Sequence, residues 1–493
     1  MHDKRRWWLW IGLLAAVAFG LRAYGATESP FGDELILWQL IHGRSFGSML
    51  TQVVQQEKTP PLGFVLSWLT SQLGPTDPWM RAPSVIAGTA LVPLVGLLAR
   101  RAFNSTAGLI AAAFAAVSPF LVFYGSEARS YSLAATLTCA SLVLLLAATD
   151  RGEASGWLWT GWAAVTAGAA LSHYTTIPVL LTSLAWALAT RKQARKALVL
   201  AAGGAFLACV WWLPSFSTQW GHSADEARRI AYLAPLSLDS IWQVGSRALV
   251  GSPIWTSIRS ISLTEVPGTF GLALVAVGFI GAAVFALVNR TGGKPKDTTW
   301  LLAAAAIAAP VALIAMSLRP HHSMLLPRNA IASLPAALAL AGGLFAKAGK
   351  PRLVGLLAAT TTLGLLLGAD AELRNFARPD MRAAADAINS RWQTGDVILS
   401  ANYFSGPPTD LTMHLGSKEA GSLKLTRTVG ERPFLDALST GATVFTVAPN
   451  IEATPDGLQP PAALASAFKP VWQHTWRGML DVTTIEWKPV QTK

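Results

Sequence analysis

The sequence has little charge and almost no cysteine. Only 13% of its 493 residues are Asp, Glu, Lys or Arg, whereas soluble globular chains carry about a quarter. The cysteines, Cys139 and Cys209, both lie inside apolar stretches. They argue against a disulfide framework and against a cysteine-based metal site. The shortage of charge argues against an ordinary soluble protein.

The chain is instead rich in long apolar blocks. Hydrophobic residues make up 52% of the chain, and the mean hydropathy is +0.41. Most of the chain is therefore expected to have lipid as its solvent. The net charge of +12 is compatible with nucleic-acid binding, but Lys and Arg lie in short clusters at the block ends. This distribution favours membrane topology, with no nucleic-acid partner.

The apolar blocks predict about eleven membrane-spanning helices of about 20 residues each. The first is expected from Trp7 to Tyr24 and the last from Leu353. The basic start "MHDKRR" also fits a signal peptide, but further apolar blocks follow, so an uncleaved first helix is expected. Lys and Arg at alternate ends place the amino terminus in the cytoplasm and the carboxy terminus outside. The short segment "PPLGFVLSWLTSQL" (60–73) is expected to be an interfacial helix.

The pattern divides the chain into two parts. Residues 1–370 form a transmembrane module, with a first external loop at 25–81 containing interfacial helices and a long external loop at 214–267. After Asp370, "RAAADAINSRWQTGDVILSANY" and "RPFLDALSTGATVFTVAPN" each predict a helix followed by a strand. "VWQHTW" and "DVTTIEW" alternate like strands. Residues 371–493 are therefore expected to form a soluble extracytoplasmic α/β domain.

Acids, bases and histidines gather in the external loops, whereas the cytoplasmic turns offer mostly Lys and Arg. The external polar candidates are Asp33, Glu34, Glu57, Lys58, Glu127, Arg129, Tyr131, His173, Tyr174, His222 and Arg328. We therefore expect the chemistry on the outer face. An external carboxylate can take a proton from a hydroxyl, and external cations can stabilise a departing phosphate.

Each candidate also has a structural interpretation, which stays open. Asp33 fits the N-cap of a helix beginning "ELILWQLI", with Glu34 in its first turn. Glu127 and Arg129 fit a structural ion pair, and Lys58 fits a snorkelling lysine. His173 fits an ordinary interfacial histidine.

The order and spacing of several motifs resemble the membrane glycosyltransferases of the GT-C class that use polyprenyl-phosphate sugars. Protein O-mannosyltransferases and the lipid A aminoarabinose transferases are the most similar families. The resemblance rests on the Asp33-Glu34 motif after the first helix, followed by "EKTPPL", "RAPSVIAG", "YGSEARSYSL", "SHYTT" and "LPRNAIASLPAALALAGG". The external carboxy-terminal domain also fits.

The resemblance implies an inverting transfer of a sugar from a polyprenyl-phosphate donor to an acceptor hydroxyl at the cytoplasmic membrane of the cell envelope. Asp33 is then the general base, with Glu34 beside it in the catalytic motif. Lys58, Arg129 and Arg328 bind the donor phosphate. Expected partners are the donor, membrane lipids and a lipid, glycan or protein acceptor. Residues that could contact substrate are Glu57, Glu127, Tyr131, His173 and Tyr174.

The family resemblance leaves a cofactor open. Some relatives hold a divalent cation, for which Glu57, His173 and His222 are weak ligand candidates here, and no metal is required by the sequence. Asn329 stands where a related "PR-Y" motif has tyrosine. The alternatives are a lipid-linked glycan flippase or transporter, a non-catalytic scaffold whose external domain binds glycan, and a ligase for whole oligosaccharides.

Overall fold

The computed structural model describes residues 2–152, 155–221, 236–238, 241–242, 245, 269–289, 296–318, 324–375, 377–401, 410–426, 430–449 and 458–490. By residue contacts the chain divides into two compact units. The membrane unit comprises Met1–Ala26 and Leu40–Glu372, and the C-terminal unit comprises Thr27–Gln39 and Leu373–Lys493. The acidic motif of the predicted first external loop therefore groups with the C-terminal part of the chain.

The membrane unit is built of helices. Its α-helices are α1 (His2–Gly25), α3 (Phe46–Gln56), α4 (Leu62–Ser71), α5 (Thr76–Met80), α6 (Ala82–Ala102), α7 (Ser105–Val117), α8 (Pro119–Ser126), α9 (Tyr131–Arg151), α10 (Gly156–Ser172), α11 (Ile177–Thr190), α12 (Arg195–Val210), α13 (Leu213–Gly221), α16 (Thr269–Val288), α17 (Asp297–Ser317), α18 (Leu334–Ala346) and α19 (Pro351–Asn375), the last crossing the unit boundary. Short 3₁₀ helices are η2 (Tyr174–Thr176), η3 (Lys192–Ala194) and η5 (Pro327–Ser333).

Within the described residues, 8 helices are long and apolar enough to cross a membrane, or 9 if the bent pair α7 and α8 forms one span. The remaining expected spans correspond to α10 and α11, which are shorter at 17 and 14 residues. The segment 60–73 contains the helix α4, as expected. The prediction of an α-helical polytopic membrane protein is confirmed.

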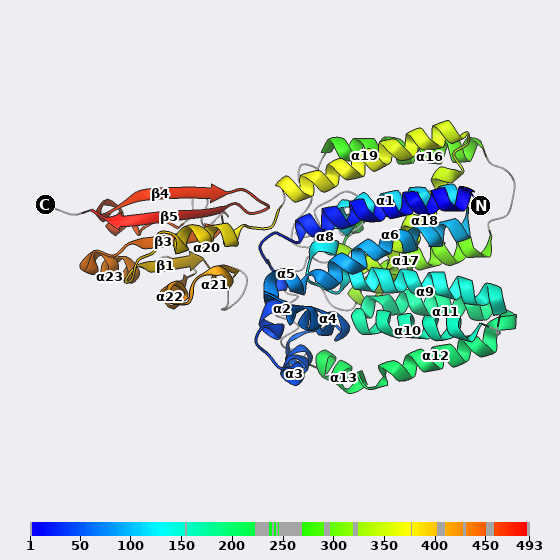
Figure 1. Cartoon of the computed structure of the whole chain (residues 1–493), viewed down its shortest axis with the longest axis horizontal. Helices are drawn as coiled ribbons and strands as arrows, with labels where there is room; N and C mark the ends of the chain where they lie inside the picture. The colour runs from blue at the N-terminus through cyan, green and yellow to red at the C-terminus, as the bar shows by residue number, and fades with distance from the viewer. Residues whose placement is uncertain are drawn as a thin grey trace. The chain divides into compact units, whose positions relative to one another are not determined.

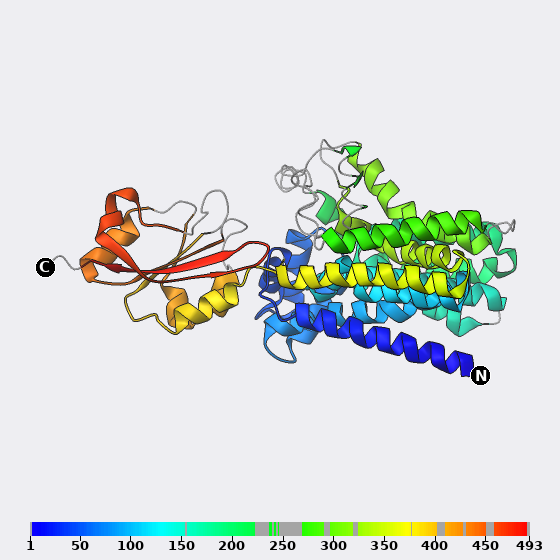
Figure 2. The same cartoon turned by 90° about the horizontal axis from the view of Figure 1, so that it is seen from above.

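The helices of the membrane unit pack closely, and small residues allow it. Figure 1 shows α9, α10, α11 and α12 side by side, in agreement with their contacts. Both views place α16 beside α19 (Figures 1 and 2). A Cβ added at Gly271 of α16 would lie 2.5 Å from the carbonyl oxygen of Gly364 in α19. Here the absence of a side chain lets the two backbones touch.

A break of 56° separates α7 from α8. Ser118 caps α8 by accepting a hydrogen bond from the Leu121 amide at 3.4 Å, and Pro119 occupies the first helical position. Arg22 of α1 is fully buried and donates to the carbonyl oxygens of Ala115 and Ala116 at the end of α7, at 3.1 Å each. The guanidinium thus satisfies carbonyls that the end of a helix leaves open.

The C-terminal unit carries a five-stranded sheet in the order β2-β1-β3-β5-β4. Its strands are β1 (Val397–Ala401), β2 (Leu423–Thr426), β3 (Val444–Pro449), β4 (Phe468–Trp476) and β5 (Val482–Pro489). Its helices are α2 (Asp33–Ile41, of which residues 33–39 belong here), α20 (Met381–Asn389), α21 (Asp410–His414), α22 (Ser417–Gly421), α23 (Arg432–Thr440) and η6 (Ala462–Ala467). β1 pairs in parallel with β2 and β3, and β5 runs antiparallel to β3 and β4.

Alternate residues of the strands fill two cores on opposite faces of the sheet. Ile398 joins the core that contains Ile388 of α20, whereas its neighbour Leu399 joins the core that contains Phe434 of α23. This alternation follows from the two-residue period of a β-strand. Helices therefore cover both faces, and the predicted α/β fold of the C-terminal part is confirmed.

Candidate functional site

A buried ion pair in the membrane unit joins Glu57 of the motif "EKTPPL" to Arg129 of the motif "YGSEARSYSL". The Arg129 guanidinium donates two hydrogen bonds to the Glu57 carboxylate, Nη1 to Oε1 at 3.0 Å and Nη2 to Oε2 at 3.2 Å. The two side chains are only 9% and 8% exposed. Arg129 thus pairs with Glu57, and the sequence-based pair of Arg129 with Glu127 stays a prediction. Such a two-pronged contact fixes the guanidinium plane as well as its position.

Local structure explains where Arg129 lies. It belongs to the turn between α8 and α9, and its carbonyl accepts from the Ser84 hydroxyl of α6 at 3.0 Å. Its guanidinium lies 5.6 Å from the ring centre of Phe64 in α4. The turn follows α8, so its position depends on the bend between α7 and α8. Arg22 and Ser118, which hold that bend, therefore act indirectly on the position of Arg129.

Lys58 lies between two anchored residues. Glu57, the C-cap of α3, is held by Arg129. The carbonyl of Thr59 accepts from the Gln219 amide of α13 at 3.1 Å. The Nζ atom of Lys58 is itself buried. The backbone on both sides of Lys58 in the motif "EKTPP" is therefore held in place.

His173 is buried, and the charges of two arginines act on it. Its Nδ1 lies 2.9 Å from the Thr175 hydroxyl and accepts from the Thr175 amide at 3.3 Å. Burial, and then the charges of Arg129 and Arg328, lower the pKa of His173 to about 3. The imidazole is therefore neutral at physiological pH. The two arginines that act on its charge come from the α8–α9 turn and from η5.

Two tyrosines complete this part of the membrane unit. Tyr131 starts α9, is buried, and its ring packs 5.4 Å from that of His173. Tyr174 donates to the Gln219 side chain at 2.6 Å and accepts from the Trp212 indole at 3.0 Å. Burial raises the pKa of Tyr174, and the Trp212 hydrogen bond opposes the rise. Glu127, also buried, ends α8.

The membrane unit thus gathers several predicted site residues around shared contacts. Contacts or charge effects connect Glu57, Arg129, Tyr131, His173 and Arg328. A second set joins Tyr174 to Thr59, next to Lys58, through Gln219. We call these residues the cation cluster, defined as Glu57, Lys58, Arg129, Tyr131, His173 and Arg328.

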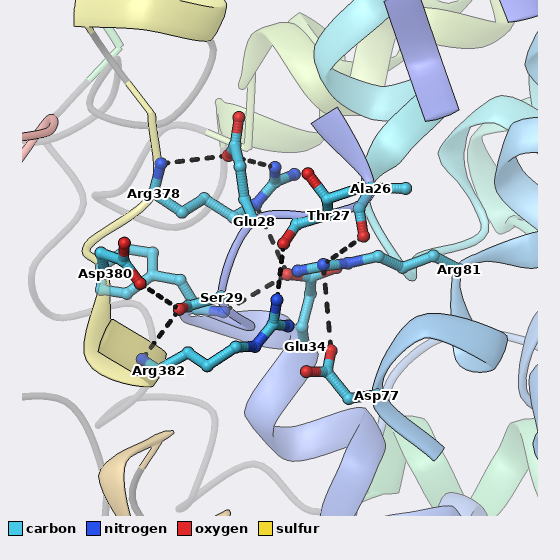
Figure 3. Close-up of polar contacts among 11 residues, drawn as sticks. Ala26, Thr27, Glu28, Ser29, Glu34, Asp77, Arg81, Arg378, Asp380 and Arg382 are labelled. Atoms are coloured by element: carbon cyan, nitrogen blue, oxygen red, sulfur yellow. Dashed lines mark hydrogen bonds and ion pairs between the residues drawn. The ribbon is translucent and has the colours of Figure 1, made fainter. Parts of the chain in front are cut away.

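The acidic motif has a separate environment in the C-terminal unit. α2 begins at Asp33, directly after Gly32, whose φ of 57° lies in the left-handed region that favours glycine. Glu34 is fully buried and accepts from the Phe31 amide at 3.3 Å. It also lies 3.4 Å from Nε of Arg378 (Figure 3). Asp33 is half-buried, and both of its interpretations, cap and base, stay predictions.

No cluster of three metal-ligating side chains occurs in the part of the chain that the structure describes. Among the weak candidates for metal ligands, Glu57 is bound to Arg129 and His173 is in contact with Thr175. The third candidate, His222, lies outside the described residues. A metal thus gains no support from the residues that the structure places.

Some residues of these networks are absent from the sequence-based candidates. Arg22 carries a signal, because a charge inside an apolar span is expensive and marks a special role. Gln219 and Arg378 carry none, because neither belongs to a recognisable motif. Their partners lie far away along the chain, as in the pair Glu28 and Arg378, separated by 350 positions.

Comparisons with known proteins agree with this architecture. Residues 58–214 match the family described as dolichyl-phosphate-mannose-protein mannosyltransferase. This stretch contains four of the six residues of the cation cluster, Lys58, Arg129, Tyr131 and His173. Glu57 directly precedes it, and Arg328 lies far outside it. Among proteins of curated function, none matches the chain in sequence.

Solved structures give a likeness of fold. One is the archaeal oligosaccharyltransferase AglB from Archaeoglobus fulgidus, in complex with an inhibitory peptide and a dolichol-phosphate. It aligns with a TM-score of 0.53 and 11% identity, over 96% of this chain and 73% of that chain. ArnT from Cupriavidus metallidurans, in the apo state, aligns with a TM-score of 0.43 and 13% identity over 97% of each chain. The sequence-based resemblance to GT-C membrane glycosyltransferases that use polyprenyl-phosphate-linked donors is thereby confirmed.

Proposed function

We propose that the protein is an inverting glycosyltransferase that moves one sugar from a polyprenyl-phosphate donor to an acceptor hydroxyl. The observation that supports this most is the cation cluster. Lys58 and Arg129 are held in fixed positions within the stretch that matches the mannosyltransferase family. Fixed cations suit a reaction whose leaving group is a phosphate anion, because they need no reorganisation when charge develops.

In the proposed reaction, Asp33 takes the proton from the acceptor hydroxyl. The acceptor oxygen forms a bond to the anomeric carbon as the bond from that carbon to the phosphate oxygen breaks. The electron pair leaves with polyprenyl phosphate, whose charge Lys58, Arg129 and Arg328 stabilise. No nucleotide is needed at this step, which suits the proposed location on the outer face of the cytoplasmic membrane.

The proposed topology keeps the amino terminus in the cytoplasm and the C-terminal unit outside. The transferred sugar is a hexose or pentose, and the acceptor is a lipid, a glycan or a protein. A protein acceptor has a parallel in AglB, which was solved with an inhibitory peptide and a dolichol-phosphate. Neutral His173 and buried Tyr131 are proposed to line the donor end of the site.

The test compares the purified wild type with Asp33→Asn in nanodiscs. Both are mixed with a panel of polyprenyl-phosphate sugars and host lipid extract, and released polyprenyl phosphate is measured by mass spectrometry. The matched control is Asp436→Asn, which removes an exposed carboxylate from α23 of the same unit. We expect release by the wild type and the control, and loss in Asp33→Asn.

The other outcomes also decide between functions. Equal release by Asp33→Asn would remove Asp33 from the chemistry and leave helix capping as its role. Donor binding without any release, in all variants, would favour the transporter or scaffold. A product heavier by many sugars would favour the oligosaccharide ligase.

A further inference from the structure

The acidic motif is built into the C-terminal unit by a dense set of polar contacts. Figure 3 shows Glu28, Ser29 and Glu34 facing Arg378, Asp380 and Arg382. Glu28 and Ser29 come from the segment after α1, and Glu34 from the first turn of α2. Arg378 and Asp380 come from the segment that leads into α20, and Arg382 from its first turn. All six belong to the same compact unit.

Arg378 makes the central contacts. Its side chain is 2% exposed. Its amide and its Nη1 both donate to Oε2 of Glu28, at 3.1 and 2.9 Å. Its Nε lies 3.4 Å from Oε2 of Glu34. One guanidinium thus holds two carboxylates, one before Asp33 and one directly after it.

Ser29 connects the same segment to the start of α20. Its hydroxyl donates to Oδ1 of Asp380 at 3.1 Å and accepts from the Arg382 amide at 3.0 Å. The same Asp380 oxygen caps α20 by accepting from the Ala383 amide at 3.0 Å. Arg382 adds a contact from Nη1 to the carbonyl of Thr27 at 2.8 Å.

The segment that carries Arg378 is itself fixed to the sheet. The Met479 amide, in the turn between β4 and β5, donates to the carbonyl of Ala377 at 2.8 Å. A Cβ added at Gly478 would lie 2.7 Å from the same carbonyl oxygen, so the two backbones are in close contact. A continuous chain of contacts therefore runs from the β4–β5 turn through Arg378 to the residues on both sides of Asp33.

We propose that Arg378 is a positioning residue for the reaction and that the C-terminal domain sets the orientation of the general base. This inference rests on the proposed function, in which Asp33 is the general base. In this role Arg378 acts through other residues and not directly on the donor or the acceptor. It fixes Glu28 and Glu34, and through them the backbone of the first turn of α2. Arginine suits this role because its planar fork can engage two carboxylates at once, which a lysine ammonium does less well.

The test uses the full-length protein with Arg378→Met, Arg378→Lys and Arg391→Met. Arg391 is the matched control, because it belongs to the same unit but packs on Trp472 of β4, 4.1 Å from the ring centre. Two quantities are measured: polyprenyl phosphate release, resolved into kcat and donor KM, and hydrogen exchange of peptides that cover residues 27–39.

We expect Arg378→Met to lower kcat about a hundredfold, the order of the loss that a misplacement of 1 Å brings. The donor KM should change less than about twofold, because the cations of the membrane unit are untouched. Exchange in residues 27–39 should become faster. Arg378→Lys should lie between Arg378→Met and the wild type, and Arg391→Met should match the wild type in both measurements.

Wild-type kcat and wild-type exchange in Arg378→Met would overturn the proposal. If that variant does not fold, Glu28→Gln replaces it, with faster exchange and a lower kcat supporting the proposal and no change overturning it. Asp33→Asn in the same assay reports the proposed function separately. An active Asp33→Asn removes Asp33 as base, while the exchange data still decide whether Arg378 orders the segment.

Discussion

Replacing Glu57 with methionine should destabilise the membrane unit strongly. The substitution removes the two carboxylate oxygens of Glu57 that accept from the Arg129 guanidinium, at 3.0 and 3.2 Å, where each side chain is less than a tenth exposed. Removing one partner of a buried ion pair costs about 3–5 kcal/mol, because the remaining charge stays buried without that partner. Arg129→Met should cost a similar amount for the same reason.

The double substitution Glu57→Met with Arg129→Met should recover most of this loss. It removes both charges together, and apolar side chains of similar volume are often close to neutral in place of a buried pair, within about 1–2 kcal/mol. The measurement is the unfolding midpoint in mixed detergent micelles with increasing SDS, for all four proteins. A loss of stability in the double variant equal to the sum of the losses in the two single variants would refute the coupling that the geometry implies.

Measuring the affinity for polyprenyl phosphate in the same four proteins distinguishes an effect on donor binding from an effect on stability. If Arg129 binds the donor phosphate, Arg129→Met and the double variant should both lose affinity for polyprenyl phosphate, although the double variant is stable. In Glu57→Met the guanidinium keeps its charge but loses the contact that fixes its orientation, so its affinity should fall less than that of Arg129→Met. Equal affinity in all four proteins would remove Arg129 from the donor site.

Two further predictions concern Gly125 and His173. Gly125→Ala should destabilise the membrane unit, because the new Cβ would lie 2.6 Å from Cδ of the buried Arg22; Gly20→Ala, whose Cβ meets nothing within 4 Å, is the control and should gain helix stability in the same SDS titration. His173 has a lowered pKa of about 3, so its contribution to stability is complete above its ordinary pKa of about 6.5 and is lost as the pH falls toward 3. Unfolding midpoints should therefore decline more steeply with acid in the wild type than in His173→Gln, by about 1.4 kcal/mol per pH unit within that window, and parallel curves would contradict the assignment.

The sequence was sufficient for the architecture because long apolar blocks and alternating strands are local signals. Each expected span begins near a helix of the structure, and "RPFLDALSTGATVFTVAPN" contains α23 and β3. The break between α7 and α8 was not predictable, since Ser118-Pro119 reads equally well as a helix start and as a loop. Its stability depends on Arg22, more than 90 positions away.

The site was predictable only in part, for the same reason. Residues near a loop motif, such as Lys58 and Arg129, stand out by type and position. The pairing of Arg129 with Glu57 was not predictable, because the two residues are 72 positions apart. The partner of Glu34 was missed altogether, since Arg378 lies in a segment with no pattern of its own.

The partners of the acidic segment lie far from it in the sequence, so this segment can reach its final structure only late in synthesis. Ser29 and Asp380 are 351 positions apart, so the ribosome synthesises almost every membrane helix before the partner of the acidic segment exists. At about 5–20 residues per second, that interval lasts on the order of tens of seconds. During this time the membrane helices can already be inserted while Asp33, the proposed base, remains without its support. If Asp33 is the base, the incomplete chain is inactive, and completion of the last domain serves as a check before lipid-linked sugar is consumed.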